Sequence, residues 1–299
     1  MSRSNACLML SLRIFCQGEF LVTILYQIAH FLRLKLNCCL IYQPLPSPSK
    51  QTKMITQPIR LVVFDMAGTT VRDNNEVLYC FAEACHQAGI HAELQRLNAL
   101  MGVSKLEVFQ LLWREQLGGS IPIEIIAERS RDAFQIFRHI LEEYYRSHPV
   151  VPTEGALEVF HWLRERDIKI ALNTGFYRAV TNIILNKLGW LAGLNADYVG
   201  DVGSIINLSL ASDEVPQGRP APLMIQQAMR TFGIEDPKQV IKVGDTPVDL
   251  AEGRNAGCAA SLAVVNGTHS REALEVLDND GLLDSLLDLP EWMGKRGFA

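Results

Sequence analysis

Uninterrupted apolar runs that end in polar or small residues recur along the chain from residue 59 onward. Such a run, bounded by turn residues, is typical of a strand that is covered on both faces in a parallel sheet. The pattern predicts three such strands and a fourth candidate. They are "IRLVVFD" at 59–65, "IKIALNTG" at 168–175, "QVIKVGDT" at 239–246 and, as the candidate, "CAASLAVVNG" at 258–267.

Amphipathic segments alternate with these strands. Apolar residues recur at helical spacing in residues 155–167, 178–190 and 220–233, which predicts an α-helix in each segment. Alternating strands and helices indicate an α/β fold with a doubly wound, mostly parallel, Rossmann-like sheet.

One long stretch, residues 74–149, breaks the alternation. It contains no convincing strand pattern and four amphipathic blocks. We interpret it as an inserted all-α helical cap domain over the carboxyl ends of the strands, where ligands bind in open α/β sheets. The α/β core then consists of residues 54–73 and 150–299. The four cap helices are predicted at 75–89, 91–102, 104–118 and 121–149.

The first 53 residues differ in character from the rest. Their apolar stretch "FLVTILYQIAHFL" is thirteen residues long, shorter than the ~20 that a membrane span needs. The following "QPLPSPSKQTK" is typical of a linker. We interpret residues 1–53 as an extension that is absent from the native protein, with Met54 as the physiological start. An amphipathic membrane-surface anchor and a packed extra helix are the alternatives.

Charge and cysteine usage narrow the class of protein. The formal net charge is -5 and the sequence pI is about 5.8, so the chain lacks the basic surface that nucleic-acid binding requires. Its seven cysteines show no paired metal spacing, which favours a reduced, cytoplasmic protein. We expect neither a nucleic-acid nor a membrane partner, and a homodimer remains an open alternative to a monomer.

Asp65 is the first candidate for chemistry. It follows the apolar run at 61–64, so we expect its carboxylate at the carboxyl end of a strand. Such a carboxylate can attack phosphorus, and the backbone N–H groups of Gly68 and Thr69 can bind phosphate oxygens. The alternative is an aspartate that only caps the start of a helix after the strand.

Two later strand ends carry complementary groups. Thr174 and Gly175 offer a hydroxyl and a backbone N–H for a phosphoryl oxygen. Asp245 and Asp249 lie four residues apart where the chain turns into a helix, a spacing that suits Mg²⁺, which prefers carboxylate oxygens. The alternative for this pair is a helix cap and a surface residue.

A phosphoryl group beside three carboxylates also needs a positive side chain. We favour Arg219 for this role, because Pro220 and Pro222 fix the backbone where a loop enters a helix. Lys242 is the alternative, although its side chain could instead extend from its strand toward solvent.

These segments, in this order, resemble the haloacid dehalogenase superfamily of phosphohydrolases over residues 59 to about 270. The resemblance implies that Asp65 forms an aspartyl-phosphate, that Thr174 binds the phosphoryl group and that Arg219 replaces the usual lysine. It also implies a Mg²⁺ cofactor at the positions of Asp65, Ala67, Asp245 and Asp249.

Ala67 is the main departure from that pattern. The superfamily commonly has a second aspartate here, which protonates the leaving oxygen and then activates water. Its absence removes general acid–base help worth about 10²–10⁴-fold in rate. The motifs "DMAGTT", "GRPAP" and "IKVGDT" resemble the phosphonatase-like branch, phosphonoacetaldehyde hydrolase and its close relatives, in which the leaving group is carbon.

That branch uses a cap lysine, which forms a Schiff base with the aldehyde substrate. The segment "LMGVSKLEV" resembles its cap motif and supplies Met101, Gly102 and Lys105. The resemblance places Lys105 at the Schiff-base position, where its pKa must be depressed by burial or a cationic neighbour. A solvated lysine in the first turn of a helix, or one that binds a substrate anion, are the alternatives.

Two neighbours depart from that branch. Val108 replaces its histidine and Phe176 its tyrosine, and we consider Tyr177, Cys80 and His86 as substitutes. We therefore expect a Mg²⁺-dependent hydrolase that releases phosphate from a small phosphorylated or phosphonate metabolite. Phosphonoacetaldehyde hydrolase proper and a non-catalytic phosphate-binding protein are the alternative functions.

Overall fold

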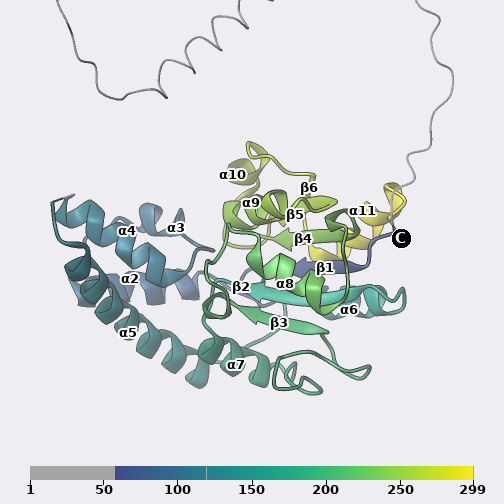
Figure 1. Cartoon of the computed structure of the whole chain (residues 1–299), viewed down its shortest axis with the longest axis horizontal. Helices are drawn as coiled ribbons and strands as arrows, with labels where there is room; N and C mark the ends of the chain where they lie inside the picture. The colour runs from purple at the N-terminus through teal and green to yellow at the C-terminus, as the bar shows by residue number, and fades with distance from the viewer. Residues whose placement is uncertain (1–57, 119, 299) are drawn as a thin grey trace, which may run out of the picture. The chain divides into compact units, whose positions relative to one another are not determined.

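A parallel sheet organises the protein. The computed structural model describes residues 58–118 and 120–298, so the interpretation of residues 1–53 lies outside the described residues. Within them, six strands form one parallel sheet in the order β3-β2-β1-β4-β5-β6 (Figure 1). This confirms the predicted α/β architecture. The strands are β1 (Leu61–Phe64), β2 (Lys169–Thr174), β3 (Leu208–Ala211), β4 (Val240–Gly244), β5 (Ala260–Val264) and β6 (Gly281–Leu283).

Helices cover both faces of the sheet, because successive strand residues point to opposite sides. Phe64 packs with Phe160 of α6 on one face, whereas Val63 clusters with Met224 of α8 on the other. The core helices are α6 (Ala156–Arg164), α7 (Arg178–Lys187), α8 (Leu223–Thr231), α9 (Pro247–Ala256), α10 (Arg271–Glu275) and α11 (Leu289–Lys295).

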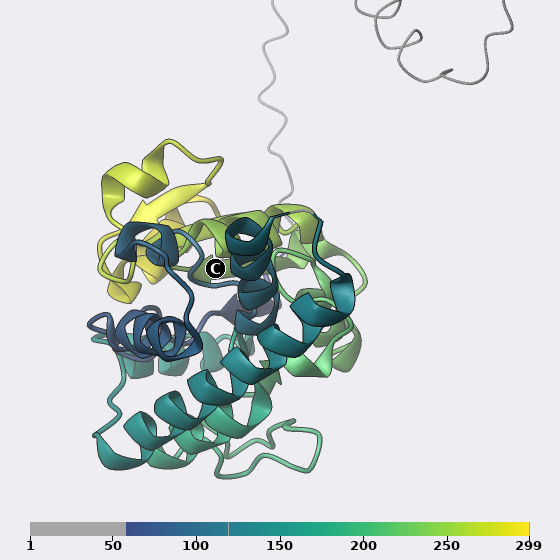
Figure 2. The ribbon, with the colours of Figure 1, turned by 90° about the vertical axis from the view of Figure 1, so that its left-hand side faces the viewer.

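The stretch at residues 74–149, between β1 and α6, is helical, as predicted. Edge-to-face contacts among Phe81, Phe109 and Phe137 join three of its helices in one apolar core, and Figure 2 looks onto these helices from their outer side. The described residues all fall in one compact unit, and the division into cap and core domains remains a prediction. The helices are α2 (Glu76–Ala88), α3 (Leu94–Asn98), α4 (Lys105–Leu117) and α5 (Ile123–Ser147).

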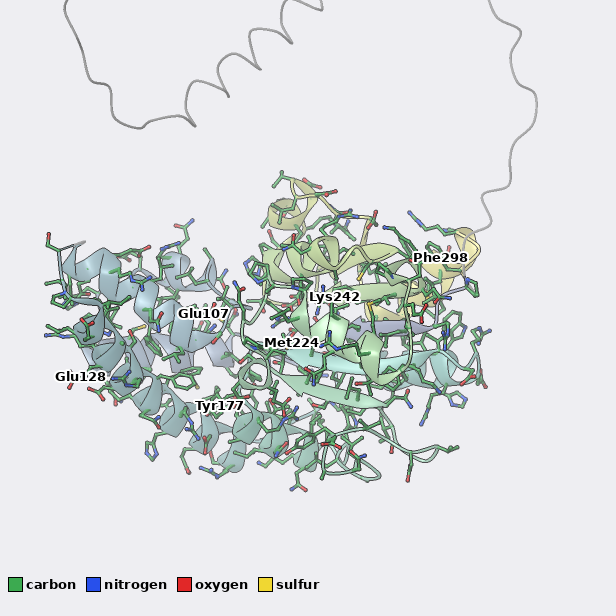
Figure 3. The ribbon with its side chains drawn as sticks, viewed as in Figure 1. Glu107, Glu128, Tyr177, Met224, Lys242 and Phe298 are labelled. Atoms are coloured by element: carbon green, nitrogen blue, oxygen red, sulfur yellow. The ribbon has the colours of Figure 1, made fainter. Side chains whose placement is uncertain are left out.

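Two chain crossings connect these helices to the sheet, and they lie side by side. The N–H of Thr153 donates to the carbonyl of Thr70 at 3.0 Å, and the N–H of Arg72 donates to that of Val151 at 3.1 Å. A further contact joins α5 to the start of α7, where the hydroxyl of Tyr177 donates to Glu142 Oε1 at 3.0 Å (Figure 3).

Strands β3 and β6 were not predicted from the apolar pattern. Each pairs with a single neighbour at an edge of the sheet. In β3 the polar Ser209 interrupts the apolar residues, and β6 contains three residues of which the first is Gly281, so neither strand shows a recognisable apolar run. Among the described residues no helix is both long and apolar enough to cross a membrane, and the three cysteines there are free and buried.

Candidate active site

Three aspartates converge at the carboxyl ends of β1 and β4, which are neighbours in the sheet. Asp65 follows β1 directly, Asp245 follows β4 directly, and Asp249 lies in the first turn of α9. One carboxylate oxygen of each lies within 4.8 Å of those of the other two, and all three residues are buried. The structure therefore brings together the acidic groups that the sequence placed in separate segments.

Arg219 joins two of these carboxylates. Its Nη1 atom lies 2.8 Å from Asp65 Oδ1 and also pairs with Asp249 Oδ1. The arginine is 2% exposed, so water does little to screen these ion pairs. The preference for Arg219 as the cation near Asp65 agrees with this geometry.

Lys242 does not extend toward solvent, and in this respect the sequence-based alternative was wrong. Its Nζ atom is completely buried, 2.9 Å from Asp249 Oδ1 and 3.2 Å from Glu252 Oε2. It also donates to Asn173 Oδ1 at 2.6 Å. Because Val240 packs on the α8 face of the sheet, the alternating strand turns Lys242 toward that same side, under α9 (Figure 3).

Burial and the neighbouring charges set the pKa values of the three aspartates apart. Burial raises the pKa of Asp65 to about 6, although the Arg219 cation acts in the opposite direction. Burial, and then the charges of Asp65 and Asp249, raise the pKa of Asp245 to about 7. Burial would raise that of Asp249 too, but Arg219 and Lys242 hold its pKa below the usual range. Asp245 is thus the carboxylate whose charge is least balanced by the protein.

This arrangement fits a Mg²⁺ ion. Mg²⁺ binds carboxylate oxygens and tolerates few protein ligands because it retains water. Within residues 58–118 and 120–298, the hydrogen-bond donors to Asp245 are neutral, namely Thr69 Oγ1 at 3.1 Å and the N–H of Thr268 at 2.7 Å. A cation near Asp245 would relieve the repulsion among three buried carboxylates.

The turn after β1 uses its small residues differently from the prediction. The N–H of Gly68 donates to the carbonyl of Val71 at 2.8 Å, and that of Thr69 donates to Met66 at 3.1 Å. The two N–H groups predicted to bind phosphate are thus hydrogen-bonded within the turn. Gly68 has φ of +85°, and a Cβ atom there would collide with the Asp245 carboxylate, so glycine permits the close approach of the turn to that side chain.

A small cavity lies against Asp65, between the sheet and the helical insert. Its volume, about 30 Å³, is enough for one or two water molecules. Of the predicted site residues, Gly68, Thr69, Asp245 and Asp249 do not line it. Its walls include the predicted residues Asp65, Ala67, Met101, Gly102, Lys105, Thr174, Gly175 and Arg219.

The insert lies tightly against the core at Gly102. A Cβ atom on Gly175 would lie 2.7 Å from the carbonyl oxygen of Gly102, and one on Gly102 would lie 2.6 Å from Thr246 Oγ1. Both glycines therefore allow the α3–α4 loop to close directly over the ends of β2 and β4.

Lys105 is buried in the cavity wall, which excludes the solvated alternative. It is the first residue of α4, its Nζ atom lies 3.4 Å from the carbonyl oxygen of Val103, and it lies 5.0 Å from the ring centroid of Phe81. Burial, and then the positive charge of Arg219, lower the pKa of Lys105 to about 8.

The suggested substitutes for the missing histidine and tyrosine do not line this cavity. Tyr177 directs its hydroxyl to Glu142, and Cys80 is buried with a pKa raised by burial to about 11. His86 lines a different hollow, on the α2–α3 side of the insert. In the cavity wall the described residues add Asp73, Thr246 and Thr268. Asp73 and Thr268 lie outside the apolar strand patterns and the recognised motifs. Thr246 ends the motif "IKVGDT", but sequence reasoning assigned no role to its hydroxyl.

Comparison with known proteins agrees with this site. The sequence profile of the haloacid dehalogenase-like hydrolases matches residues 59–257. The chain belongs to this family. Within it the chain belongs to the phosphonatase-like branch, since its relatives include phosphonoacetaldehyde hydrolases.

This chain is 32% identical over 210 residues to phosphonoacetaldehyde hydrolase of Bacillus cereus strain G9842. The match covers 67% of this chain and 73% of the relative. The chain is also 31% identical over 207 residues, with the same shares covered, to that of Latilactobacillus sakei subsp. sakei strain 23K. Family membership supports a hydrolase, so the reading as a non-catalytic phosphate-binding protein is set aside.

Solved structures show the same fold. A hydrolase from Pseudomonas syringae matches with a TM-score of 0.62 at 21% identity, covering 79% of this chain and 98% of that one. A phosphonoacetaldehyde hydrolase like protein from Oleispira antarctica matches with a TM-score of 0.60 at 21% identity, covering 81% and 93%. At this identity the likeness concerns the fold alone.

Proposed function

We propose that this hydrolase depends on Mg²⁺ and releases phosphate from a small phosphorylated or phosphonate metabolite through an aspartyl-phosphate at Asp65. The observation that carries the proposal is the convergence of three buried aspartates beside a small cavity with cationic walls. An anion is favoured there by Arg219 and Lys105, which both line the cavity.

Asp65 has the properties of a nucleophile. With a pKa of about 6 its carboxylate is mostly ionised at neutral pH, and the 2.8 Å contact with Arg219 holds its Oδ1 atom in place. In the proposed reaction a carboxylate oxygen bonds to phosphorus as the leaving group departs with its bonding electrons. Thr174 and Gly175 lie in the wall of the same cavity, and we assign them to the phosphoryl oxygens.

The residues that would hold Mg²⁺ are Asp65, Asp245 and Asp249, with the backbone carbonyl of Ala67. When bound, the ion would supply the positive charge that allows a phosphoryl group to approach these carboxylates. The chain itself fixes Asp249 through Arg219, Lys242 and Thr246, whose hydroxyl donates to Asp249 Oδ2 at 2.6 Å.

The test begins with phosphate release from a panel of small phosphomonoesters and from phosphonoacetaldehyde, with Mg²⁺ or with EDTA. Asp65→Asn keeps an acceptor for Arg219 but removes the nucleophile, so we expect its rate to fall to that of a control without enzyme. Asp278→Asn, at a side chain that is 82% exposed, is the matched control and should retain full activity.

A second measurement looks for the intermediate itself. Acid quenching during turnover should leave a phosphate adduct on the peptide that contains Asp65, detected by mass spectrometry. Turnover that survives Asp65→Asn, or an adduct on another residue, would disprove the assignment of Asp65.

The burial of Lys105 favours a second candidate, phosphonoacetaldehyde hydrolase proper. A lysine with a pKa of about 8 is partly neutral at physiological pH and can add to an aldehyde. Loss of water then gives an iminium, which accepts the electrons of the C–P bond when Asp65 attacks phosphorus. The names of the curated relatives point the same way.

Borohydride trapping separates the two candidates. With phosphonoacetaldehyde as substrate, reduction should attach the two-carbon unit to Lys105 and inactivate the protein. Lys105→Met should escape both effects. Phosphomonoesterase activity without any adduct on Lys105 would rule out the second candidate and leave the first.

A further inference from the structure

The cavity contains a carboxyl group that the mechanism so far leaves unused. The side chain of Ala67 has no ionisable group, so it cannot move a proton. Among the cavity-lining residues that the structure describes, the carboxyls belong to Asp65 and Asp73. Asp65 is already assigned as the nucleophile, which leaves Asp73.

We propose that Asp73 is the proton-transfer residue of this site and takes the role of the carboxylate that is missing at Ala67. This inference rests on the proposed function, because it assigns a step of the same aspartyl-phosphate reaction.

The chain fixes the position of Asp73. It lies in the first crossing between β1 and α2, next to Arg72, whose N–H donates to the carbonyl of Val151 in the second crossing. Its own Oδ1 atom accepts the N–H of Val77 at 3.4 Å, in the first turn of α2. The crossing therefore fixes the backbone beside Asp73, and the first turn of α2 offers its carboxyl a donor at the cavity wall.

The electrostatic surroundings of Asp73 suit proton transfer. Burial, and then the hydrogen bond to Glu76 and the charge of Glu76, raise its pKa to about 8, and Asp245 adds a smaller effect in the same direction. The other titratable groups whose charges interact with Asp73 are Lys105, Cys80, Tyr144 and Tyr145. A carboxyl with this pKa carries its proton at neutral pH, and a general acid works best when its pKa lies near the working pH.

Glu76 connects this carboxyl to the surface. Its side chain is partly exposed and hydrogen-bonded to Asp73, which lowers the pKa of Glu76 against the effect of its own partial burial. Of the pair, Asp73 lines the cavity and has the raised pKa, whereas Glu76 is absent from the cavity wall and has the lowered pKa.

Each half of the reaction balances with Asp73 in this role. In the first half, the bond from phosphorus to the leaving oxygen breaks as Asp65 bonds to phosphorus, and Asp73 gives its proton to that oxygen. In the second half, a water oxygen bonds to phosphorus, the bond from phosphorus to Asp65 breaks, and the Asp73 carboxylate accepts the proton that the water loses. A cavity of about 30 Å³ keeps such a water close to both carboxyls.

The test uses Asp73→Asn, which keeps an acceptor for the N–H of Val77 but cannot transfer the proton. For an alkyl phosphate we expect kcat/KM to fall by about 10²–10⁴-fold, the usual contribution of a general acid. For p-nitrophenyl phosphate, whose leaving group needs no proton, kcat/KM should stay within about threefold, because this parameter covers only the steps up to departure of the leaving group. For both substrates kcat should fall and phosphorylated Asp65 should accumulate, because attack by water is slowed.

Glu83→Gln is the matched control, an exposed acid on the same helix, and it should behave as the wild type. Equal losses of kcat/KM with the two substrates, or a wild-type rate with the alkyl phosphate, would overturn the proposal. If Asp73→Asn does not fold, Asp73→Ser offers the same comparison with a smaller acceptor. If Asp65→Asn is inactive and Asp73→Asn behaves as the wild type, only the role of Asp73 is rejected. If Asp65→Asn is active, the proposed function itself is rejected.

Discussion

At the scale of single residues, the site is defined by an excess of buried negative charge. Four carboxyls are buried there, those of Asp65, Asp245, Asp249 and Glu252, beside three buried basic groups, those of Arg219, Lys242 and Lys105. Arg219 and Lys242 pair with Asp65, Asp249 and Glu252, which leaves Asp245 without a cation among the described ion pairs. Burying charges in this way costs free energy unless each one is paired. The buried carboxyls lie where we propose that a Mg²⁺ ion binds, and the bound ion would offset this cost.

Lys242 should be essential for stability. Lys242→Met leaves Glu252 buried without its cation, so we expect the free energy of unfolding to fall by about 3–5 kcal/mol, measured by urea denaturation. Lys295→Met removes a lysine that is 69% exposed from its pair with Glu291 and should cost no more than about 1 kcal/mol. Similar losses in the two variants would show that the buried ion pairs of Lys242 stabilise the fold no more than the exposed ion pair of Lys295 does.

Lys105 should react in a pH range set by its environment. The neutral amine is the nucleophile, and with a pKa of about 8 about a tenth of it is neutral at pH 7. The yield of the borohydride-trapped adduct should therefore rise between pH 6 and 8 and level off above pH 8. Modification of free N-acetyl-lysine by the same aldehyde, an amine in water with a pKa of about 10.4, should continue to rise to pH 10. A parallel rise at Lys105 and at the free amine would contradict the depressed pKa of Lys105.

At the scale of secondary-structure elements, the loop between α3 and α4 closes the site. Its central residue, Gly102, has φ of +83° and lies against Thr246 of the core. The loop also brings Met101 and Lys105 to the cavity. The insert thus contributes to the site mainly through one loop and the first turn of one helix.

Gly102→Ala should disturb activity more than stability. A Cβ atom there meets Thr246 Oγ1 at 2.6 Å, so the loop must move away from the core, and we expect kcat/KM to fall by about tenfold or more, since small misplacements at a site can cost about 10²-fold. Gly89→Ala is the matched control, because φ is +78° and nothing lies within 4 Å of the added carbon. Both variants should lose about 1–2 kcal/mol of stability, measured by thermal unfolding. Full activity in Gly102→Ala would mean that this contact is not needed.

The helical elements could be predicted more fully than the strands. Helices α2, α4 and α5 repeat an apolar stripe over three or more turns, which is a strong signal in sequence. Strand β3 is interrupted by Ser209 and β6 contains only three residues, so no continuous run identifies these two edge strands. Their pairing with β2 and β5 comes from the assembled sheet and not from their own residues.

At the scale of the whole molecule, stability and function oppose each other at the junction of sheet and insert. The three aspartates repel one another in the absence of a cation, and the fold holds them together all the same. A ligand that binds only the folded state raises its stability, by about 2.7 kcal/mol at a concentration one hundred times its dissociation constant. Mg²⁺ should therefore stabilise the protein against heat.

Asp245→Asn tests this balance. In EDTA we expect the variant to unfold at a higher temperature than the wild type, by about 2–4 °C for each kcal/mol of repulsion that is relieved. In Mg²⁺ the order should reverse, because the variant has lost a ligand for the ion and gains little from it. Scanning calorimetry of both proteins under both conditions measures the effect. An equal gain from Mg²⁺ in the two proteins would place the ion elsewhere.

The sequence alone determined the type of fold and the principal chemical groups. The four continuous apolar runs from residue 59 onward all form buried parallel strands, and a carboxylate that follows such a run reaches the functional edge of the sheet. This is why Asp65 and Asp245 could be singled out from the sequence. Arg219 followed from the need to balance their charge, and Lys105 from the resemblance to the phosphonatase-like branch.

Only the tertiary structure decided which partners these groups contact and which of them line the cavity. No local sequence pattern encodes burial or the distance between remote residues. The structure shows that Lys242 points inward and pairs with Asp249 and Glu252. It also shows that the N–H groups of Gly68 and Thr69 are hydrogen-bonded within their own turn. The same fold places Asp73 in the cavity wall. A side chain acquires its charge state and its partners from elements that are far away in sequence, and those elements meet only when the sheet and the helical insert have folded together.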